Sequence, residues 1–155
     1  NVALFSKHKV FTEVEMRSRC EVHLENYCKV LRIEALTMAE MVRKDIIPAA
    51  YTYLKRLSET AVAVKSACPE LDCAMEINML KYLRTLTDSL YVNINKLEEI
   101  LAGAEKCGSE LESAFYRDKV LPVMGELRSA ADEIERFVGE KYWPYPTYGE
   151  LLFSV

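Results

Sequence analysis

Apolar residues spaced alternately four and three positions apart dominate this chain. The first series is Leu24, Cys28, Leu31, Ala35, Met38 and Val42, and it resumes as Ala50, Leu54, Leu57, Ala61, Val64 and Cys68. This spacing places the side chains on one face of an α-helix. Thr12 and Glu15 have the spacing of a capping box, in which each side chain accepts from the other's backbone amide. The pattern therefore predicts a helix over residues 12–68.

Two further stretches carry the same pattern. Residues 69–107 contain Leu71, Met75, Met79, Leu83, Leu86, Leu90, Ile94, Leu97, Leu101 and Ala104, and residues 109–139 contain Leu111, Phe115, Leu121, Leu127, Ala131, Ile134 and Val138. Pro69 suits a first helical position, and Gly108 suits a left-handed C-cap. Ser109 with Glu112 forms a second capping-box pattern, and Gly139 is expected to close the last helix. We therefore expect helices over 69–107 and 109–139.

Pro48 and Pro122 lie inside the predicted helices. Each removes a hydrogen bond and crowds the carbonyl four residues earlier, but the apolar series continues beyond both. We expect a bend at each proline rather than a loop. The segment Arg43–Pro48 is similar to Arg117–Pro122; an ancient repeat and a chance match both explain so short a similarity.

These elements predict an all-α fold in one domain of residues 1–155. The expected architecture is an antiparallel bundle of three long helices, the first kinked at Pro48 and possibly counted as four, because short connections make neighbouring helices antiparallel. A straight helix over 12–68 would be about 80 Å long at 1.5 Å per residue. Either the kink folds it back or its start projects from the bundle.

Residues 140–155 are expected to form an extended aromatic tail. Pro144 and Pro146 prevent helix continuation, and Trp143 is the only tryptophan of the chain. Trp143, Tyr145, Leu151 and Phe153 are too apolar for a solvated tail. We favour packing of these side chains on the bundle over the alternative, in which Pro-Tyr-Pro is a ligand for an aromatic groove of another protein.

Charge and composition exclude several classes of partner. The net charge is −4, and no basic block occurs, so no nucleic acid and no membrane is expected as a partner. No apolar run is long enough to cross a bilayer. The chain begins at Asn1 without Met, so we expect a part of a longer protein or a trimmed form. The predicted location is cytoplasmic.

The cysteines do not have the pattern of a disulfide framework. Their number is odd and they are scattered over predicted helices: Cys20, Cys28, Cys68, Cys73 and Cys107. This distribution favours reduced, partly buried thiols over the disulfides of a secreted protein. The spacing of Cys68 and Cys73 fits no zinc-ribbon pattern.

No catalytic constellation is recognisable. A di-iron bundle requires Glu-x-x-His pairs, but Phe5 precedes His8 by three positions and Cys20 precedes His23 by three. Glu21 and Glu25 share a helix face, which we interpret as a solvated surface. No glycine-rich phosphate loop and no nucleophile–base pair is evident. We assign no catalytic, cofactor-binding or metal-binding residue.

Several segments resemble the C-terminal region of type III glutamine synthetase, a large bacterial form of the enzyme. They are Lys7–Glu15, His23–Lys29, Ile33–Met38 and the tail Tyr142–Val155, whose sequence is YWPYPTYGELLFSV. The resemblance extends over the chain from about residue 5 and is densest at both ends. Over about residues 60–115 it consists mainly of the helical pattern.

The resemblance implies a role within a larger enzyme. Glutamine synthetases join ammonia to glutamate with ATP and a divalent metal such as Mg²⁺, in a β-rich catalytic domain and at subunit contacts of a ring homo-oligomer. The family's catalytic motifs lie upstream of the matching region, so the fragment alone is expected to be inactive. Its expected partners are its own upstream catalytic domain and neighbouring subunits.

Two hypotheses follow. In the first, the chain is a non-catalytic C-terminal helical domain of a glutamine synthetase with a structural or subunit-assembly role. In the second, it is a stand-alone helical interaction or regulatory domain that only resembles the tail of the enzyme. The sequence upstream of Asn1 distinguishes them, because only the first requires a catalytic domain in the same reading frame.

Overall fold

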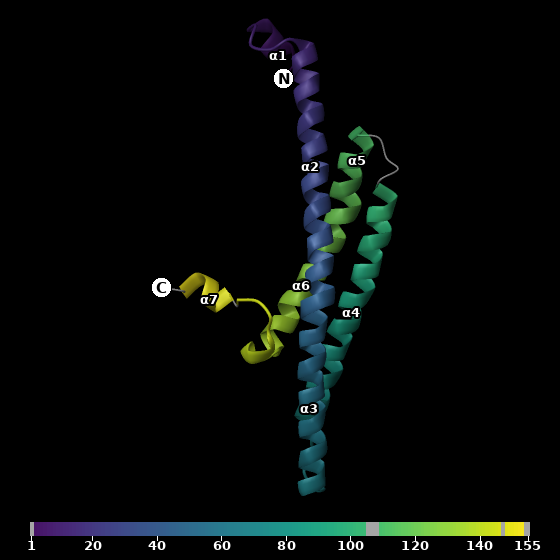
Figure 1. Ribbon diagram of the computed structural model, residues 1–155, viewed down its shortest axis with the longest axis vertical. Helices are drawn as coiled ribbons and strands as arrows, with labels where there is room; N and C mark the ends of the chain where they lie inside the picture. Colours follow the sequence, from purple (N-terminus) through teal and green to yellow (C-terminus); the bar gives the residue numbers. More distant parts are fainter. Residues whose placement is uncertain (1, 105–108, 147, 154–155) are drawn as a thin grey trace.

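The computed structural model describes residues 2–104, 109–146 and 148–153, and every regular element among them is helical (Figure 1). The all-α prediction is thereby confirmed. In chain order the elements are α1 Val2–Lys7, α2 Glu13–Met41, η1 Val42–Ile46, α3 Ile47–Ala67, α4 Ala74–Ala104, α5 Ser109–Phe115, η2 Tyr116–Val120, α6 Leu121–Phe137, η3 Glu140–Tyr142 and α7 Tyr148–Phe153.

The elements α2, η1 and α3 follow one another without a break and form the long rod of Figure 1. The predicted capping box at its start is confirmed. The Thr12 amide donates to Glu15 Oε2 at 2.8 Å, and the Glu15 amide donates to Thr12 Oγ1 at 3.3 Å. These bonds from Thr12 lower the pKa of the Glu15 carboxyl. The start of the rod projects from the bundle, because no residue from 13 to 27 is buried.

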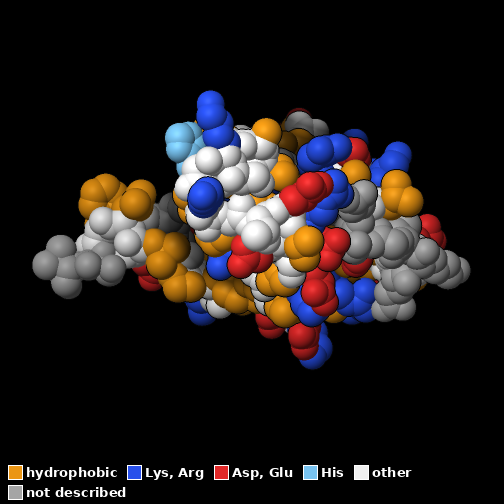
Figure 2. Space-filling model, turned by 90° about the horizontal axis from the view of Figure 1, so that it is seen from above, with side chains coloured by type: hydrophobic (Ala, Val, Ile, Leu, Met, Phe, Trp, Pro, Cys, Tyr) orange, Lys and Arg blue, Asp and Glu red, His pale blue; other side chains and the backbone are white. Residues whose placement is uncertain are grey.

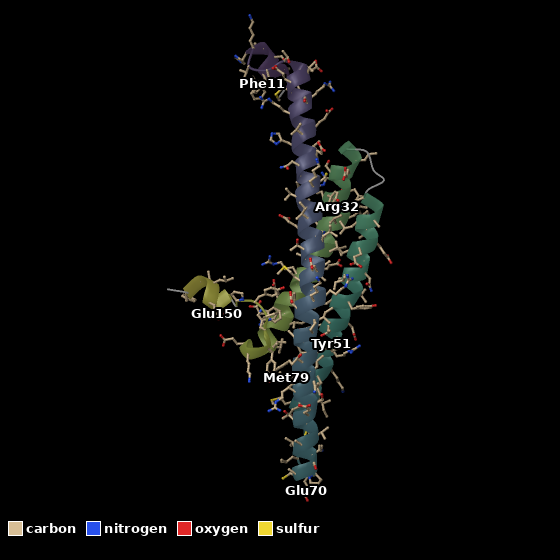
Figure 3. All side chains as sticks on the ribbon, in the orientation of Figure 1. Phe11, Arg32, Tyr51, Glu70, Met79 and Glu150 are labelled. Atoms are coloured by element: carbon tan, nitrogen blue, oxygen red, sulfur yellow. The ribbon has the colours of Figure 1, made fainter. Side chains whose placement is uncertain are left out.

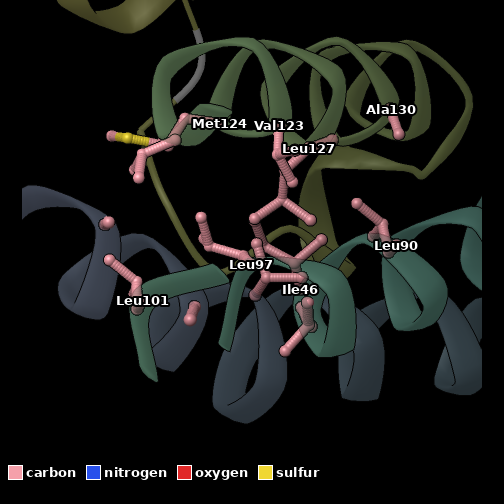
Figure 4. Packing of buried hydrophobic residues seen from close by; sticks show 14 of the residues in the cluster. Ile46, Leu90, Leu97, Leu101, Val123, Met124, Leu127 and Ala130 are labelled. Carbon is pink, nitrogen blue, oxygen red and sulfur yellow. The ribbon is translucent and has the colours of Figure 1, made fainter. Parts of the chain in front are cut away.

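The core lies where three helical stretches meet. Figure 1 shows α4 rising beside α3 and the α5–α6 stretch descending beside α4, and α4 packs most extensively against α6 and α3. Leucines from α4 and α6 interlock there (Figure 4). Leu83, Leu90, Leu97, Leu127 and Ile134 are fully or almost fully removed from water. Each such side chain contributes roughly 1.5–3 kcal/mol by burial.

Both internal prolines lie just after a π-helical turn. The Ile47 amide bonds to the Val42 carbonyl, and the Leu121 amide bonds to the Tyr116 carbonyl, each five residues back. The prediction that the helix continues past Pro48 and Pro122 is confirmed. At each proline the helix contains a wide π turn instead of a simple kink. A proline ring would collide with the carbonyl four residues earlier in an α-helix, and the wider turn accommodates it.

The wide turn at η2 also decides which residues of the third stretch are buried. Tyr116 and Val120 lie inside the core with exposed fractions of 1% and 0%. Leu111 and Leu121, which the spacing placed in the core, are 73% and 37% exposed. The predicted helical face was wrong at these two positions, because π geometry advances about one residue more per turn than the α-helix assumed by a 4-3 pattern.

The second helix begins later than predicted, at Ala74 instead of residue 69. Cys68 has extended backbone (φ −141°, ψ 90°), the conformation that a following proline favours. The Leu71 amide then bonds to the Cys68 carbonyl in a turn. Cys73 is buried, with Sγ 3.7 Å from the Ala61 carbonyl oxygen. Leu71 and Met75 are consequently exposed, at 53% and 66%, contrary to prediction.

The end of the third helix also differs from the prediction. The helix ends at Phe137, and Val138 is extended with its side chain buried. Gly139 has φ −60° and therefore does not act as a left-handed cap. The predicted cap at Gly108 and the side-chain cap of Ser109 lie outside the part of the chain that the structure describes.

The tail is not extended throughout. Residues 140–142 form a 3₁₀ turn and Tyr148–Phe153 form the short helix α7. Trp143 and Tyr145 are partly buried against the core, as predicted. Leu151 and Phe153 are 64% and 79% exposed, so their predicted burial in this chain was wrong. Figure 1 shows the reason: α7 points away from the bundle.

Candidate interaction surface

An apolar groove runs between the α2–η1 stretch and α6. It encloses about 400 Å³ and is lined by Ile33, Glu34, Thr37, Met38, Met41, Val42, Ile46, Leu127, Arg128, Ala131 and Asp132. Its floor is part of the core, because Val42, Ile46 and Leu127 are buried. Its walls are open to water: Ile33 is 64% exposed and Met41 38% exposed.

The groove exists because α2 carries apolar side chains on more than its core face. Leu31 and Ala35 point into the core, whereas Ile33 and Met41 remain outside it. The small side chains Thr37 and Ala131 leave the space between the two walls unfilled. Water in such a space gains few hydrogen bonds, so the surface favours an apolar ligand or partner.

The groove continues towards the tail. A second hollow of about 350 Å³ shares Met41, Ile46, Arg128, Ala131 and Asp132 with the first, and is also lined by Glu135, Trp143, Tyr145, Pro146 and Leu151. The two hollows therefore form one continuous feature, which we call the α2–α6 groove. Its far end is closed by the tail of the same chain.

Two tyrosines hold the tail in place, one by a hydrogen bond and one by a ring contact. The Tyr145 hydroxyl donates a hydrogen bond of 2.5 Å to Asp45 Oδ2 in η1. Burial, followed by this bond to a carboxylate, raises the pKa of Tyr145 to about 12. The Tyr142 ring packs on the Tyr53 ring with centroids 5.6 Å apart. Beyond these anchors the tail leaves the surface, and Glu150 of α7 stands well away from the bundle in Figure 3.

The opposite end of the molecule is a projecting arm, which we define as residues 2–27. Helix α1 turns back through Lys9, which has a left-handed φ of 53°. The rings of Phe5 and Phe11 lie 5.9 Å apart, and the Arg19 guanidinium lies 4.5 Å from the Phe11 ring centre. In Figure 3 Phe11 lies at this end, far from the tail.

Side chains of two kinds gather on the arm. Apolar residues remain exposed there: Val2, Leu4, Val10, Val14 and Val22. Lys7, His8 and Lys9 follow one another and are also exposed. Figure 2, which looks down on this end, shows lysine or arginine and histidine side chains next to each other at one edge. The end of the arm thus combines apolar surface with positive charge, whereas residues 13–27 carry four glutamates and two arginines.

The residues considered for chemistry lie on a solvated face. Glu21, His23 and Glu25 are all exposed, and Glu25 pairs with Lys29 at 2.6 Å. This bond from Lys29 lowers the pKa of Glu25. Within residues 2–104, 109–146 and 148–153, no group of three or more His, Cys, Asp or Glu side chains is arranged to hold a metal ion.

Four cysteines are described, and all are free thiols. Cys20 and Cys68 are exposed, and Cys28 and Cys73 are buried. Burial, together with the nearby Glu112 carboxylate, raises the pKa of the Cys28 thiol. Cys107 lies outside the described residues. Among the described helices, none is long and apolar enough to cross a membrane.

The pattern of apolar positions did not reveal the α2–α6 groove. The available signal was the second apolar stripe on α2, with Val22, Ile33 and Met41 off the core face. The fold and this surface define a helical module whose described residues offer a place to bind a partner.

Comparison with known proteins identifies the family that this module resembles. A family model described as Glutamine synthetase C-terminal domain matches residues 1–65. A glutamine synthetase of Butyrivibrio fibrisolvens is 44% identical over 156 aligned residues, which cover 100% of this chain and 22% of that protein. A type-3 glutamine synthetase of Dictyostelium discoideum is 30% identical over 99% of the chain, and a glutamine synthetase of Bacteroides fragilis is 27% identical over 98%.

The resemblance to the C-terminal region of type III glutamine synthetase is thereby confirmed. The chain spans 22% of the length of each of these relatives.

Proposed function

We propose that this chain is the non-catalytic C-terminal helical domain of a glutamine synthetase and serves its structure or subunit assembly. In this proposal the full-length protein is an ATP-dependent glutamate–ammonia ligase that uses Mg²⁺. The upstream catalytic domain and neighbouring subunits of a ring homo-oligomer are the partners, and the location is cytoplasmic. The observation that carries the proposal is the similarity of the whole chain to about a fifth of the length of known glutamine synthetases.

The architecture supports an assembly role. In the proposed antiparallel bundle of three long helices, the core is a continuous set of leucines and small residues. Several charged side chains form exposed ion pairs between consecutive helical turns, such as Arg17 with Glu13 at 2.7 Å and Arg84 with Asp88 at 2.8 Å. Such pairs contribute little to stability and belong to a solvated surface.

Apolar features that remain open in the described part of the chain include the α2–α6 groove, the arm and α7. Together they expose more large apolar side chains than a module acting alone would require. Surfaces of this kind are typical of contacts with other domains or subunits. They therefore favour the domain of a larger assembly over the stand-alone regulatory domain.

The first test is the reading frame that encodes this chain. We expect a glutamine synthetase catalytic domain directly upstream of Asn1, and a frame without one would contradict the proposal. The second test is titration calorimetry of the 155-residue chain with ATP and Mg²⁺. We expect no saturable heat, whereas one-to-one binding would show that the chain holds a nucleotide site.

A further inference from the structure

A hollow between α3 and α4 differs from the α2–α6 groove in the charges that surround it. It encloses about 580 Å³ and is lined by Tyr51, Leu54, Lys55, Ser58, Leu80, Lys81 and Arg84. None of these residues lines the α2–α6 groove. The two helices pack against each other here, and Figure 3 places Tyr51 on α3 beside α4. We call this feature the α3–α4 hollow.

Every charged residue that lines the α3–α4 hollow is a cation. Lys55 comes from α3, and Lys81 and Arg84 come from α4, although the chain as a whole has a net charge of −4. Lys81 forms no ion pair with another described residue. Lys55 lies 3.8 Å from Glu59, and Arg84 lies 2.8 Å from Asp88. Because both pairs are exposed and hold their cations weakly, these cations remain able to meet a further carboxylate.

The floor of the hollow is apolar. Leu54 is buried, Leu80 is half-buried, and the Tyr51 side chain is 47% exposed. The Arg84 guanidinium lies 5.8 Å from the Tyr51 ring centre, so the ring and the cation form one wall. Ser58 donates its hydroxyl proton to the Leu54 carbonyl at 2.8 Å and so offers no donor to a ligand. The hollow therefore combines apolar contact with a positively charged rim.

Shape and charge together select the class of occupant. A pocket for a small metabolite encloses its ligand and directs several polar groups at it, whereas this hollow lies open between two helices. Nucleic acid requires a longer stripe of cations than three side chains, two of which already have carboxylate partners. A protein segment that lies along the two helices meets the apolar floor and the cations at once, provided that it carries carboxylates.

We propose that the α3–α4 hollow docks an acidic segment of a partner protein. One apolar side chain of that segment contacts Tyr51, Leu54 and Leu80. Carboxylates on either side of this anchor pair with the cations of α3 and α4. The inference deepens the proposed assembly role and rests on it for its biological meaning, because it names the chemistry of the surface that another subunit or the upstream catalytic domain presents.

Synthetic peptides test the docking on the 155-residue chain. The probe is a short peptide with one phenylalanine between runs of glutamate, and its binding is followed by the amide chemical shifts of the ¹⁵N-labelled chain. We expect saturable shifts around Tyr51, Leu80 and Arg84. A peptide with serine in place of phenylalanine should bind about tenfold more weakly, because the apolar anchor is lost. Shifts that do not saturate, or that centre on another part of the chain, overturn the proposal.

Two lysine substitutions test the role of the rim. Lys81→Glu is expected to weaken binding of the probe at least about tenfold and to make the dissociation constant less sensitive to salt. Lys119→Glu on η2 is the matched control, because Lys119 is also exposed, has no ion-pair partner among the described residues, and its substitution changes the net charge equally. Both variants should keep the helix content of the parent chain in circular dichroism. Equal effects of the two substitutions on binding contradict the proposed contact.

Competition separates this docking from other binding of anions. Inorganic phosphate should displace the probe no better than sodium chloride of the same ionic strength, and a single-stranded oligonucleotide should compete less well than unlabelled peptide. Stronger displacement by phosphate would identify a site for small anions, and stronger displacement by the oligonucleotide a nucleic-acid surface; either result overturns the proposal. The reading frame upstream of Asn1 is unaffected by these outcomes, so failure of the docking is distinguishable from failure of the proposed function.

Discussion

Tyr145 in the tail donates a 2.5 Å hydrogen bond to Asp45, which lies a hundred positions earlier within the π turn η1. The bond joins two features of the sequence, the aromatic tail and the segment before Pro48. It also fixes the tail at the end of the α2–α6 groove, where Tyr145 and Trp143 form part of the lining.

Replacing Tyr145 by Phe removes this bond and leaves the Asp45 carboxylate without its tail partner. We expect a loss of about 1–2 kcal/mol in the free energy of unfolding at neutral pH. Tyr91→Phe is the control, because Tyr91 is 63% exposed. Urea unfolding followed by circular dichroism measures both variants. Equal stability of Tyr145→Phe and the parent chain would show that the bond contributes nothing.

The Tyr145 hydroxyl should also make the free energy of unfolding depend on pH in the alkaline range. Because the folded protein raises the pKa of Tyr145 from 10.0 to about 12, the neutral hydroxyl is favoured by folding. Its contribution is fully present below pH 10 and is lost as the pH rises towards 12. The difference in stability between the parent chain and Tyr145→Phe should therefore shrink over that interval. A difference that stays constant or grows would contradict the assignment.

Removal of residues 143–155 should lower the thermal midpoint by several degrees or cause aggregation, because Trp143 and Tyr145 cover part of the core. We expect the residues of the tail to contribute unequally to this change in thermal midpoint. Trp143→Ala should account for most of it, whereas Phe153→Ala, at a side chain 79% exposed, should change the midpoint little. Differential scanning calorimetry of the three variants tests the division. A larger effect at Phe153 than at Trp143 would show that α7 packs on the bundle.

The core should respond strongly to the residues that the structure buries. Leu97→Ala, at a side chain with no exposed surface, should cost about 2–5 kcal/mol. Leu111→Ala, at 73% exposure, should change stability by less than about 0.5 kcal/mol. The spacing of apolar residues alone assigned both leucines to the core. Comparable losses in chemical denaturation would support the sequence pattern against the observed packing.

Thiol reactivity tests burial independently. In a Cys107→Ser background, a thiol reagent added to the folded chain should label Cys20 and Cys68 rapidly and Cys28 and Cys73 only after unfolding. Burial raises the pKa of Cys28, which further lowers its thiolate fraction. Under denaturing, non-reducing conditions the parent chain should take up five labels, one for each cysteine. Fewer labels in fresh protein would reveal a disulfide.

Local rules predicted much of the fold, since helix caps and apolar spacing act over a few residues. The Thr12–Glu15 cap, the continuation past both prolines and the burial of Leu83 to Leu101 on one face follow from such rules. The π turns could not be predicted this way, because the choice between a kink and a wide turn depends on how Tyr116 and Val42 pack in the finished core.

The groove and the tail depend on contacts between distant segments. Whether Leu151 or Trp143 is buried is decided by where η1 and α6 place Asp45 and Ala131, which no sequence spacing encodes. The similarity to type III glutamine synthetase came from long motifs at both ends of the chain. Those motifs indicate the family but not which apolar surfaces remain exposed.

We propose that this domain supports assembly without taking part in catalysis. The most direct test compares the proposed full-length glutamine synthetase with a form that lacks the segment corresponding to residues 1–155, by sedimentation velocity and by nucleotide binding to the catalytic region. We predict that the shortened protein loses its native oligomeric mass while its folded catalytic region still binds ATP with Mg²⁺. A shortened protein that assembles and forms glutamine at the rate of the intact enzyme would contradict the account.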